Sequence, residues 1–228
     1  MYNQFQTADH YVLDEQQRNR VMRNTYVLLA LSMLPTVLGA WIGVETGISR
    51  VFSGGLGMIL MLAGAFGFIY AIEKTKHSVT GVYVLLGFTF FMGLMLSRMI
   101  AMVLGFKNGA ELVMTAFGGT AGVFFLMASL STVIKRDLSS MGKWLTIGAM
   151  VLVVGSIINM FVASSAGMMV ISVLSIGIFS AFMLYDLKQI VDGGETNYIS
   201  ATLTLYLDVI NVFQSLLALL GIFGGERE

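Results

Sequence analysis

The sequence predicts an all-α integral membrane protein whose seven transmembrane helices form one bundle. Of its 228 residues, 57% are hydrophobic and only 11% are charged, against about 45–50% and about 25% in ordinary soluble domains. The mean hydropathy is +0.84. Charge-free runs of the length that crosses a bilayer, about 20 residues, recur along the chain. A soluble domain of this size needs a polar surface over its core, and the composition excludes that class.

Seven spans joined by short loops are predicted, at residues 25–44, 51–72, 78–97, 112–134, the two halves of 144–185, and 196–225. The third run ends beside Arg98, and the last contains one charge, Asp208. Residues 144–185 carry no charge and are about twice as long as one crossing requires at ~1.5 Å per residue. We expect them to fold back at the small, polar residues 163–167. No strand or soluble domain is predicted.

The polar ends and the basic residues predict an orientation. Residues 1–24 contain no long apolar stretch, so they are not a cleaved signal peptide and form a polar tail. Residues 25–225 form the membrane domain and 226–228 a short terminal tail. Nine of the thirteen Lys and Arg residues fall on the side of the amino terminus, which predicts a cytoplasmic amino terminus and a periplasmic carboxyl terminus. A six-span alternative with a re-entrant last segment would place both ends inside.

The residue types exclude several kinds of chemistry. There is no cysteine, so disulfides, thiol nucleophiles, Cys-ligated zinc and iron–sulfur clusters are excluded. Neither His10 nor His77 lies in an apolar run, which argues against a membrane-embedded histidine metal site or Ser–His hydrolase. Thirteen basic and thirteen acidic residues give no net charge, so a polybasic nucleic-acid binder is excluded. We expect no required cofactor, and the sequence fixes no oligomeric state.

Small residues at helical spacing predict close contacts between helices. The pattern occurs at Gly39, Gly43 and Gly47, and again at Gly118 and Gly122. Small side chains at every fourth position let the backbones of two membrane helices approach each other.

Asp208 is the clearest candidate functional residue. A charge at the bilayer centre costs about 2.5–3.5 kcal/mol on insertion scales, and such residues usually face the bundle interior. Thr204, Asn211 and Ser215 lie on the same helical face, so this polar stripe is predicted to point inward. The plainer alternative is that Asp208 only hydrogen-bonds Asn211 and a neighbouring helix.

Asp186 is the second candidate, at the end of the preceding run. Gly193 and Gly194 turn a short connection, so the last two helices are predicted to be antiparallel neighbours whose carboxyl groups meet. Two carboxylates in a medium of low dielectric cannot both ionise cheaply, so the pair would titrate as a unit. It would serve as a proton switch, a cation site or a catalytic pair. Alternatively, Asp186 pairs with Lys188 or caps a helix.

Arg98 is predicted mainly to anchor its helix, because a long side chain near the end of a span reaches the headgroups. It is also a possible basic partner of the aspartates. An intramembrane aspartyl protease is a minor alternative, since Tyr185-Asp186 matches half of that motif. The other half, Gly-x-Gly-Asp, is replaced by Leu205-Tyr206-Leu207-Asp208, and no proline follows Pro35. We therefore expect no enzyme.

The same two segments carry a family resemblance. Residues 184–186 (LYD) and 203–213 (LTLYLDVINVF) resemble the Bax inhibitor-1 family of membrane proteins. Four further segments resemble its proteobacterial YccA-like branch, namely 23–26 (RNTY), 118–121 (GGTA), 135–138 (KRDL) and 193–199 (GGETNYI).

The resemblance implies a central helix surrounded by the others, and a pH-sensitive calcium leak. Asp186 and Asp208 fall on the two aspartates that share protons, hold the leak closed and, tentatively, contact calcium. The family's basic partner would be Lys74, Lys76 or Arg98 here. The branch implies a bacterial inner-membrane protein that binds, is degraded by and modulates an FtsH-type membrane AAA protease, with residues 1–24 as the cytosolic handle.

Overall fold

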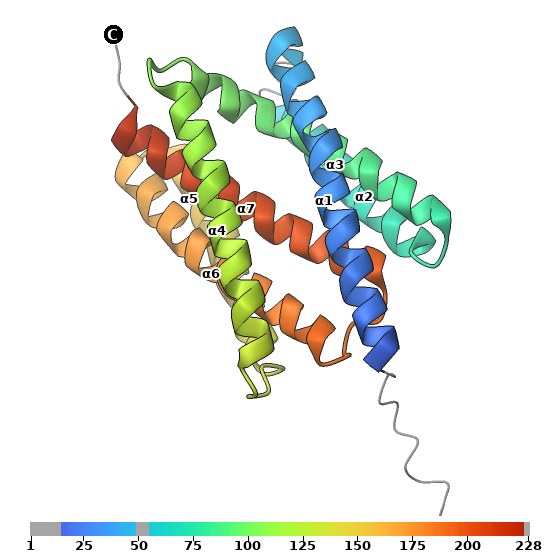
Figure 1. Cartoon of the computed structure of the whole chain (residues 1–228). Coiled ribbons are helices and arrows are strands. Elements are labelled where there is room, and N and C mark those ends of the chain that lie inside the picture. Colours follow the sequence, from blue (N-terminus) through green and yellow to red (C-terminus); the bar gives the residue numbers. More distant parts are fainter. Residues whose placement is uncertain (1–14, 49–54, 226–228) are drawn as a thin grey trace, which may run out of the picture.

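The computed structural model describes residues 15–48 and 55–225 (Figure 1). The described residues form helices and contain no strand, so the all-α prediction is confirmed. In chain order the helices are α1 (Glu15–Thr46), α2 (Gly55–Thr75), α3 (Val79–Leu104), α4 (Gly109–Val133), α5 (Met141–Val162), α6 (Ser165–Val191) and α7 (Tyr198–Gly224).

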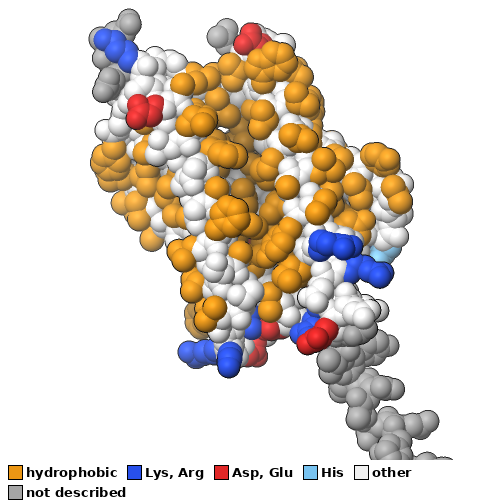
Figure 2. Space-filling view, in the orientation of Figure 1, with side chains coloured by type: hydrophobic (Ala, Val, Ile, Leu, Met, Phe, Trp, Pro, Cys, Tyr) orange, Lys and Arg blue, Asp and Glu red, His pale blue; other side chains and the backbone are white. Residues whose placement is uncertain are grey.

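The helices are those of a multi-pass membrane protein. Six of them, α1 and α3 to α7, are long and apolar enough to cross a bilayer. Figure 2 shows hydrophobic side chains over the middle of one face and charged side chains towards its ends. Helix α2 is not among the six within the described residues, so a seventh span stays a prediction.

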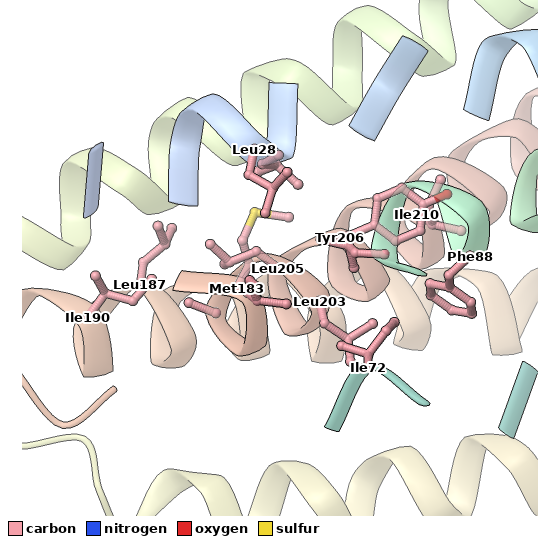
Figure 3. Close-up of a cluster of buried hydrophobic side chains, with 14 of the residues drawn as sticks. Leu28, Ile72, Phe88, Met183, Leu187, Ile190, Leu203, Leu205, Tyr206 and Ile210 are labelled. Atoms are coloured by element: carbon pink, nitrogen blue, oxygen red, sulfur yellow. The ribbon is translucent and has the colours of Figure 1, made fainter. Parts of the chain in front are cut away.

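Helix α7 forms the centre of the bundle. It packs against α1, α2, α3, α4 and α6. Its side chains Leu205 and Tyr206 are fully buried and meet Met183 of α6, Phe88 of α3 and Leu28 of α1 in the main core (Figure 3). The Tyr206 hydroxyl lies 2.9 Å from Thr36 Oγ1 and 3.3 Å from the Thr89 carbonyl oxygen. Polar anchors therefore fix α7 against α1 and α3.

Helices α1 and α3 form the closest pair. A Cβ atom at Gly39 would clash with the Phe90 carbonyl oxygen, and one at Gly93 with the Thr36 carbonyl oxygen. Gly43 is likewise in contact with Ser97. The predicted close contact is confirmed at Gly39 and Gly43, because only glycine leaves room there for the opposing backbone.

Other glycines of the same pattern behave differently. Gly47 has φ 63° and follows the last residue of α1, where it ends the helix. No atom lies within 4 Å of a Cβ atom built on Gly118 or Gly122, on the outward face of α4. The predicted helix contact at these two glycines is therefore wrong within this chain.

Two boundaries can be compared with the prediction. The turn within 144–185 is confirmed, because Ala163 takes a left-handed conformation (φ 53°) and the Ser164 hydroxyl accepts a hydrogen bond from Gly167 N at 3.1 Å. Helix α1 begins at Glu15, ten residues before the predicted span, so the described part of segment 1–24 is helical. A helix need not end where the bilayer ends, and Arg18 Nη1 contacts the Val191 carbonyl oxygen at 3.4 Å.

Candidate functional site

Asp208 lies in the middle of α7 and is almost sealed from the surface. Its relative exposure is 5%, and its Oδ2 atom is buried without a hydrogen-bond partner among the described residues. A buried polar atom without a partner costs free energy, and for a charged carboxylate the cost is greater still. Asp208 is therefore stable in this position only when it holds a proton or when water or a cation reaches it.

Asp186, one turn before the end of α6, faces Asp208. The two helices pack side by side, and the carboxyl groups of Asp186 and Asp208 are close enough to influence each other's charge. Thr204 of α7 lies beside Asp186, and its hydroxyl donates to the Ala201 carbonyl oxygen at 3.3 Å. Ionised carboxylates only accept hydrogen bonds, so a direct hydrogen bond between the two groups requires one shared proton.

A polar cavity opens beside Asp186. We name it the loop cavity, because the α6–α7 connection borders it. It measures about 220 Å³. Its lining residues are Tyr185, Asp186, Gln189, Ile190, Gly194, Glu195, Ala201 and Thr204.

Glu195 is the residue of the loop cavity that sequence reasoning missed. Its Oε1 atom accepts a hydrogen bond from Asn197 N at 2.7 Å, and its own N–H donates to the Gln189 carbonyl oxygen at 3.1 Å. These bonds hold a second carboxylate at the cavity that Asp186 lines. The sequence did contain an indication of its position, because Glu195 directly follows the two glycines of the connection between α6 and α7 and lies nine residues after Asp186.

A second polar cavity lies beside the α5–α6 hairpin, and we name it the hairpin cavity. It measures about 340 Å³ and lies between residues of α3, α5, α6 and α7. Its polar lining is Ser156, Asn159, Ser172, Ser175, Asn211, Gln214 and Ser215. The remaining lining is Met99, Met160, Met168, Ile171 and Ala218.

The polar stripe predicted on α7 runs from one cavity towards the other. Thr204 lines the loop cavity, while Asn211 and Ser215 line the hairpin cavity. Seven residues separate Thr204 from Asn211, which is roughly 10 Å of helix. Asp208 lies between them and lines neither cavity. The structure thus brings the stripe, Asp186 and Asp208 together across the bundle.

The alternative roles considered for the aspartates find no support in the hydrogen bonds. The Asn211 side-chain amide donates to the Leu207 carbonyl oxygen at 2.7 Å, and in the described part of the chain no hydrogen bond joins Asn211 to Asp208. Lys188 pairs with Asp192 at 2.7 Å, and the suggestion that it pairs with Asp186 is wrong.

None of the proposed basic partners reaches the aspartates among the described residues. Arg98 is exposed near the end of α3 and forms no ion pair there. Lys76 pairs with Glu73 at 2.5 Å, and its pKa is raised chiefly by that hydrogen bond. The Lys74 ammonium lies 5.6 Å from the centre of the Tyr70 ring.

The site offers few ligands to a metal ion. Within residues 15–48 and 55–225, no three His, Asp or Glu side chains come together. Calcium usually takes six to eight oxygen ligands. A calcium ion at Asp186 and Asp208 would therefore take most of its ligands from water and neutral oxygens such as that of Thr204. Such a site suits passing contact better than tight storage.

Known proteins match this chain over almost its whole length. Residues 18–225 match the family model described as inhibitor of apoptosis-promoting Bax1. The chain is 34% identical to an uncharacterised protein of Neisseria meningitidis, covering 95% of this chain and 96% of that one. It is also 34% identical to the Escherichia coli K12 protein named modulator of FtsH protease YccA, over 89% of this chain and 90% of that one. A second Escherichia coli relative is named inner membrane protein YccA, with the same identity and coverage.

Proposed function

The chain belongs to the family of inhibitors of apoptosis-promoting Bax1, and on that premise we propose that it is a proton-controlled leak for cations, calcium in particular. The proposed location is a bacterial inner membrane, after the relative named for it. The amino terminus would lie in the cytoplasm. Asp186 and Asp208 would form the gate.

One observation carries the proposal: a buried aspartate with an unpartnered oxygen faces a second aspartate between two polar cavities. With one proton shared, the two carboxyl groups attract each other and hold α6 against α7. When that proton leaves, two like charges face each other in a medium of low dielectric and repel. That repulsion would favour separation of the helices and entry of water or a cation.

Calcium flux into proteoliposomes, followed over a range of pH, tests this gate. We expect the wild-type flux to increase with pH. In Asp208→Asn the amide can donate permanently to Asp186, so the flux should stay low at every pH. Glu111→Gln is the matched control, because Glu111 is an exposed carboxylate in the first turn of α4. A wild-type flux and pH dependence in Asp208→Asn would overturn the proposal.

A second candidate function is modulation of an FtsH-type membrane protease. The observation that favours it is the relative with that name, at 34% identity over 89% of the chain. The polar segment 1–24 would be the handle that the protease grips. Contact between Arg18 and Val191 would connect this handle to the end of α6, five residues after Asp186.

Co-purification and turnover test the protease role. We expect the full chain to co-purify with the protease and to be degraded faster than a variant lacking residues 1–14. Equal lifetimes together with failure to co-purify would contradict it. The two functions are compatible, because a leak can itself be a regulated substrate. The aspartyl protease alternative would require Asp186→Asn to abolish a measured cleavage.

A further inference from the structure

The hairpin cavity contains an unusual set of polar side chains. Within the described chain, no hydrogen bond joins the side chains of Ser156, Asn159, Ser172, Ser175 or Gln214 to a protein atom. In the described residues, the buried side-chain polar atoms that lack a hydrogen-bond partner are one atom each of Arg18, Ser200 and Asp208, and none belongs to this set. These groups therefore open into the cavity.

Other hydroxyl groups in this bundle behave in a different way. Ser32, Thr120 and Ser129, for example, each donate to the carbonyl oxygen four residues earlier, at 2.7–2.8 Å. A hydroxyl in an apolar helix normally satisfies itself in this manner. Ser172 and Ser175 do not, although they are only 5% and 8% exposed. Polar groups without a protein partner at this depth require another partner, and water is the simplest.

The architecture explains why a cavity persists at this point. Among the described residues α5 packs only against α6, so no direct packing closes the space between α5 and α7. The hairpin holds the wall in place, because Ala163 N donates to the Asn159 carbonyl oxygen at 2.7 Å. A volume of about 340 Å³ accommodates on the order of ten water molecules at ~30 Å³ each.

We infer that the hairpin cavity is a water-filled vestibule that brings water and small cations to within one helical turn of Asp208. It lies towards the end of the bundle where α3, α5 and α7 end and α6 begins, because its lining includes Met99, Met160, Met168 and Ala218 near those helix ends. Its lining is neutral, so it admits a hydrated cation without trapping it. Passage of that cation beyond Asp208 rests on the proposed function, whereas the hydration of the vestibule does not.

The absence of cysteine from the chain provides a clean test. Ser172→Cys and Ser215→Cys place single thiols in the vestibule. Thr115→Cys is the matched control, since Thr115 is exposed on α4, outside the cavity, six residues from the start of its helix. Ser172 is seven residues from the start of α6. The probe is a cationic methanethiosulfonate reagent applied to native membrane fragments, and mass spectrometry counts the modified protein.

We expect both vestibule thiols to react at least about tenfold faster than the control thiol, because the reagent attacks thiolates and these form in water. A rate at either position less than about tenfold above that of Thr115→Cys would overturn the inference. Circular dichroism and gel filtration show that each variant is folded. The rate of thiol modification is measured independently of calcium flux. If the thiols react rapidly but no calcium flux is found, the proposed function is wrong and the inference of a water-filled vestibule still holds.

Discussion

The hydrogen bond between Tyr206 and Thr36 gives the sharpest test of how α7 is held. Thr36 Oγ1 lies 2.8 Å from the Ser32 carbonyl oxygen and 2.9 Å from the Tyr206 hydroxyl oxygen, and the Tyr206 hydroxyl donates to the Thr89 carbonyl oxygen at 3.3 Å. Both side chains are buried. Asp208 follows Tyr206 by two residues, so this bond also helps set the height of the carboxyl group in the bundle.

The perturbation is a double-mutant cycle of Tyr206→Phe and Thr36→Val. Both changes remove a hydroxyl and keep most of the apolar volume. A typical hydrogen bond contributes about 0.5–1.5 kcal/mol net, and measured bonds between membrane helices average about 0.6 with a maximum near 1.7 kcal/mol. The short distance and full burial place this one near 1 kcal/mol, or roughly fivefold in the unfolding equilibrium constant.

The assay is reversible unfolding in mixed micelles by titration with sodium dodecyl sulfate, followed by circular dichroism. Each single variant should lose about 1 kcal/mol, and the double variant should lose clearly less than their sum. Strictly additive losses, with a coupling energy below about 0.3 kcal/mol, would show that the bond does not contribute. In that case apolar packing and the 3.4 Å bond from Thr202 Oγ1 to the Thr25 carbonyl oxygen would hold α7 against α1.

Three further predictions follow from the packing and the loops. Gly93→Ala should destabilise the protein by at least about 2 kcal/mol, because the added methyl group overpacks against the α1 backbone. Gly118 lies in open space, so Gly118→Ala should stabilise the protein by up to about 1 kcal/mol through helix propensity. Equal effects of the two substitutions in the same unfolding assay would contradict this packing. Asn197 Oδ1 accepts hydrogen bonds from the N–H groups of residues 199 and 200 and so caps the start of α7. Asn197→Ala should lower the free energy of unfolding by about 1–2 kcal/mol and speed amide hydrogen exchange in the first turn of α7. Unchanged exchange there would argue against the cap. The hydrogen bonds from Ser139 lower the pKa of the Asp137 carboxyl group in the folded state. Ionised Asp137 therefore stabilises the fold at pH values above the pKa that it has in the unfolded chain. This stabilisation disappears as the pH falls through the lowered pKa of the folded state. Ser139→Ala should shift the Asp137 carbon resonance to titrate at higher pH, and an unmoved titration would refute the assignment.

Much of the fold follows from the apolar runs. They predicted the helices and the turn near Ala163, because long charge-free segments in a bilayer have few alternatives to the helix. The glycines show where such reasoning ends. Gly39 and Gly118 sit in the same spacing pattern, yet one contacts a helix and the other contacts nothing in the chain. Lipid tails and a helical core are equally apolar, so the sequence alone does not distinguish the two faces.

The candidate site was predictable where a charge interrupts an apolar run. Asp208 met that condition, and so did Arg98, which the structure places at the surface away from the aspartates. Neutral side chains gave no such signal. Ser172 and Asn159 are unremarkable within their helices, and only the tertiary arrangement that keeps α5 apart from α7 brings them to one cavity.

The helix at the centre of the bundle is also the last of the described helices along the chain. Helices α1 and α3 can pair early through their glycines, but the site for α7 stays unfilled until residue 224 has left the ribosome. At about 5–20 residues per second, the 120 residues from the end of α3 to the end of α7 take on the order of ten seconds to synthesise, and α1 and α3 lack α7 during that time. During that interval polar groups such as Thr36 lack their final partner, and a chain truncated before Tyr198 never acquires it. Insertion of α7 is therefore the step that completes the core of this bundle, and the helices made before it depend on it for their final packing.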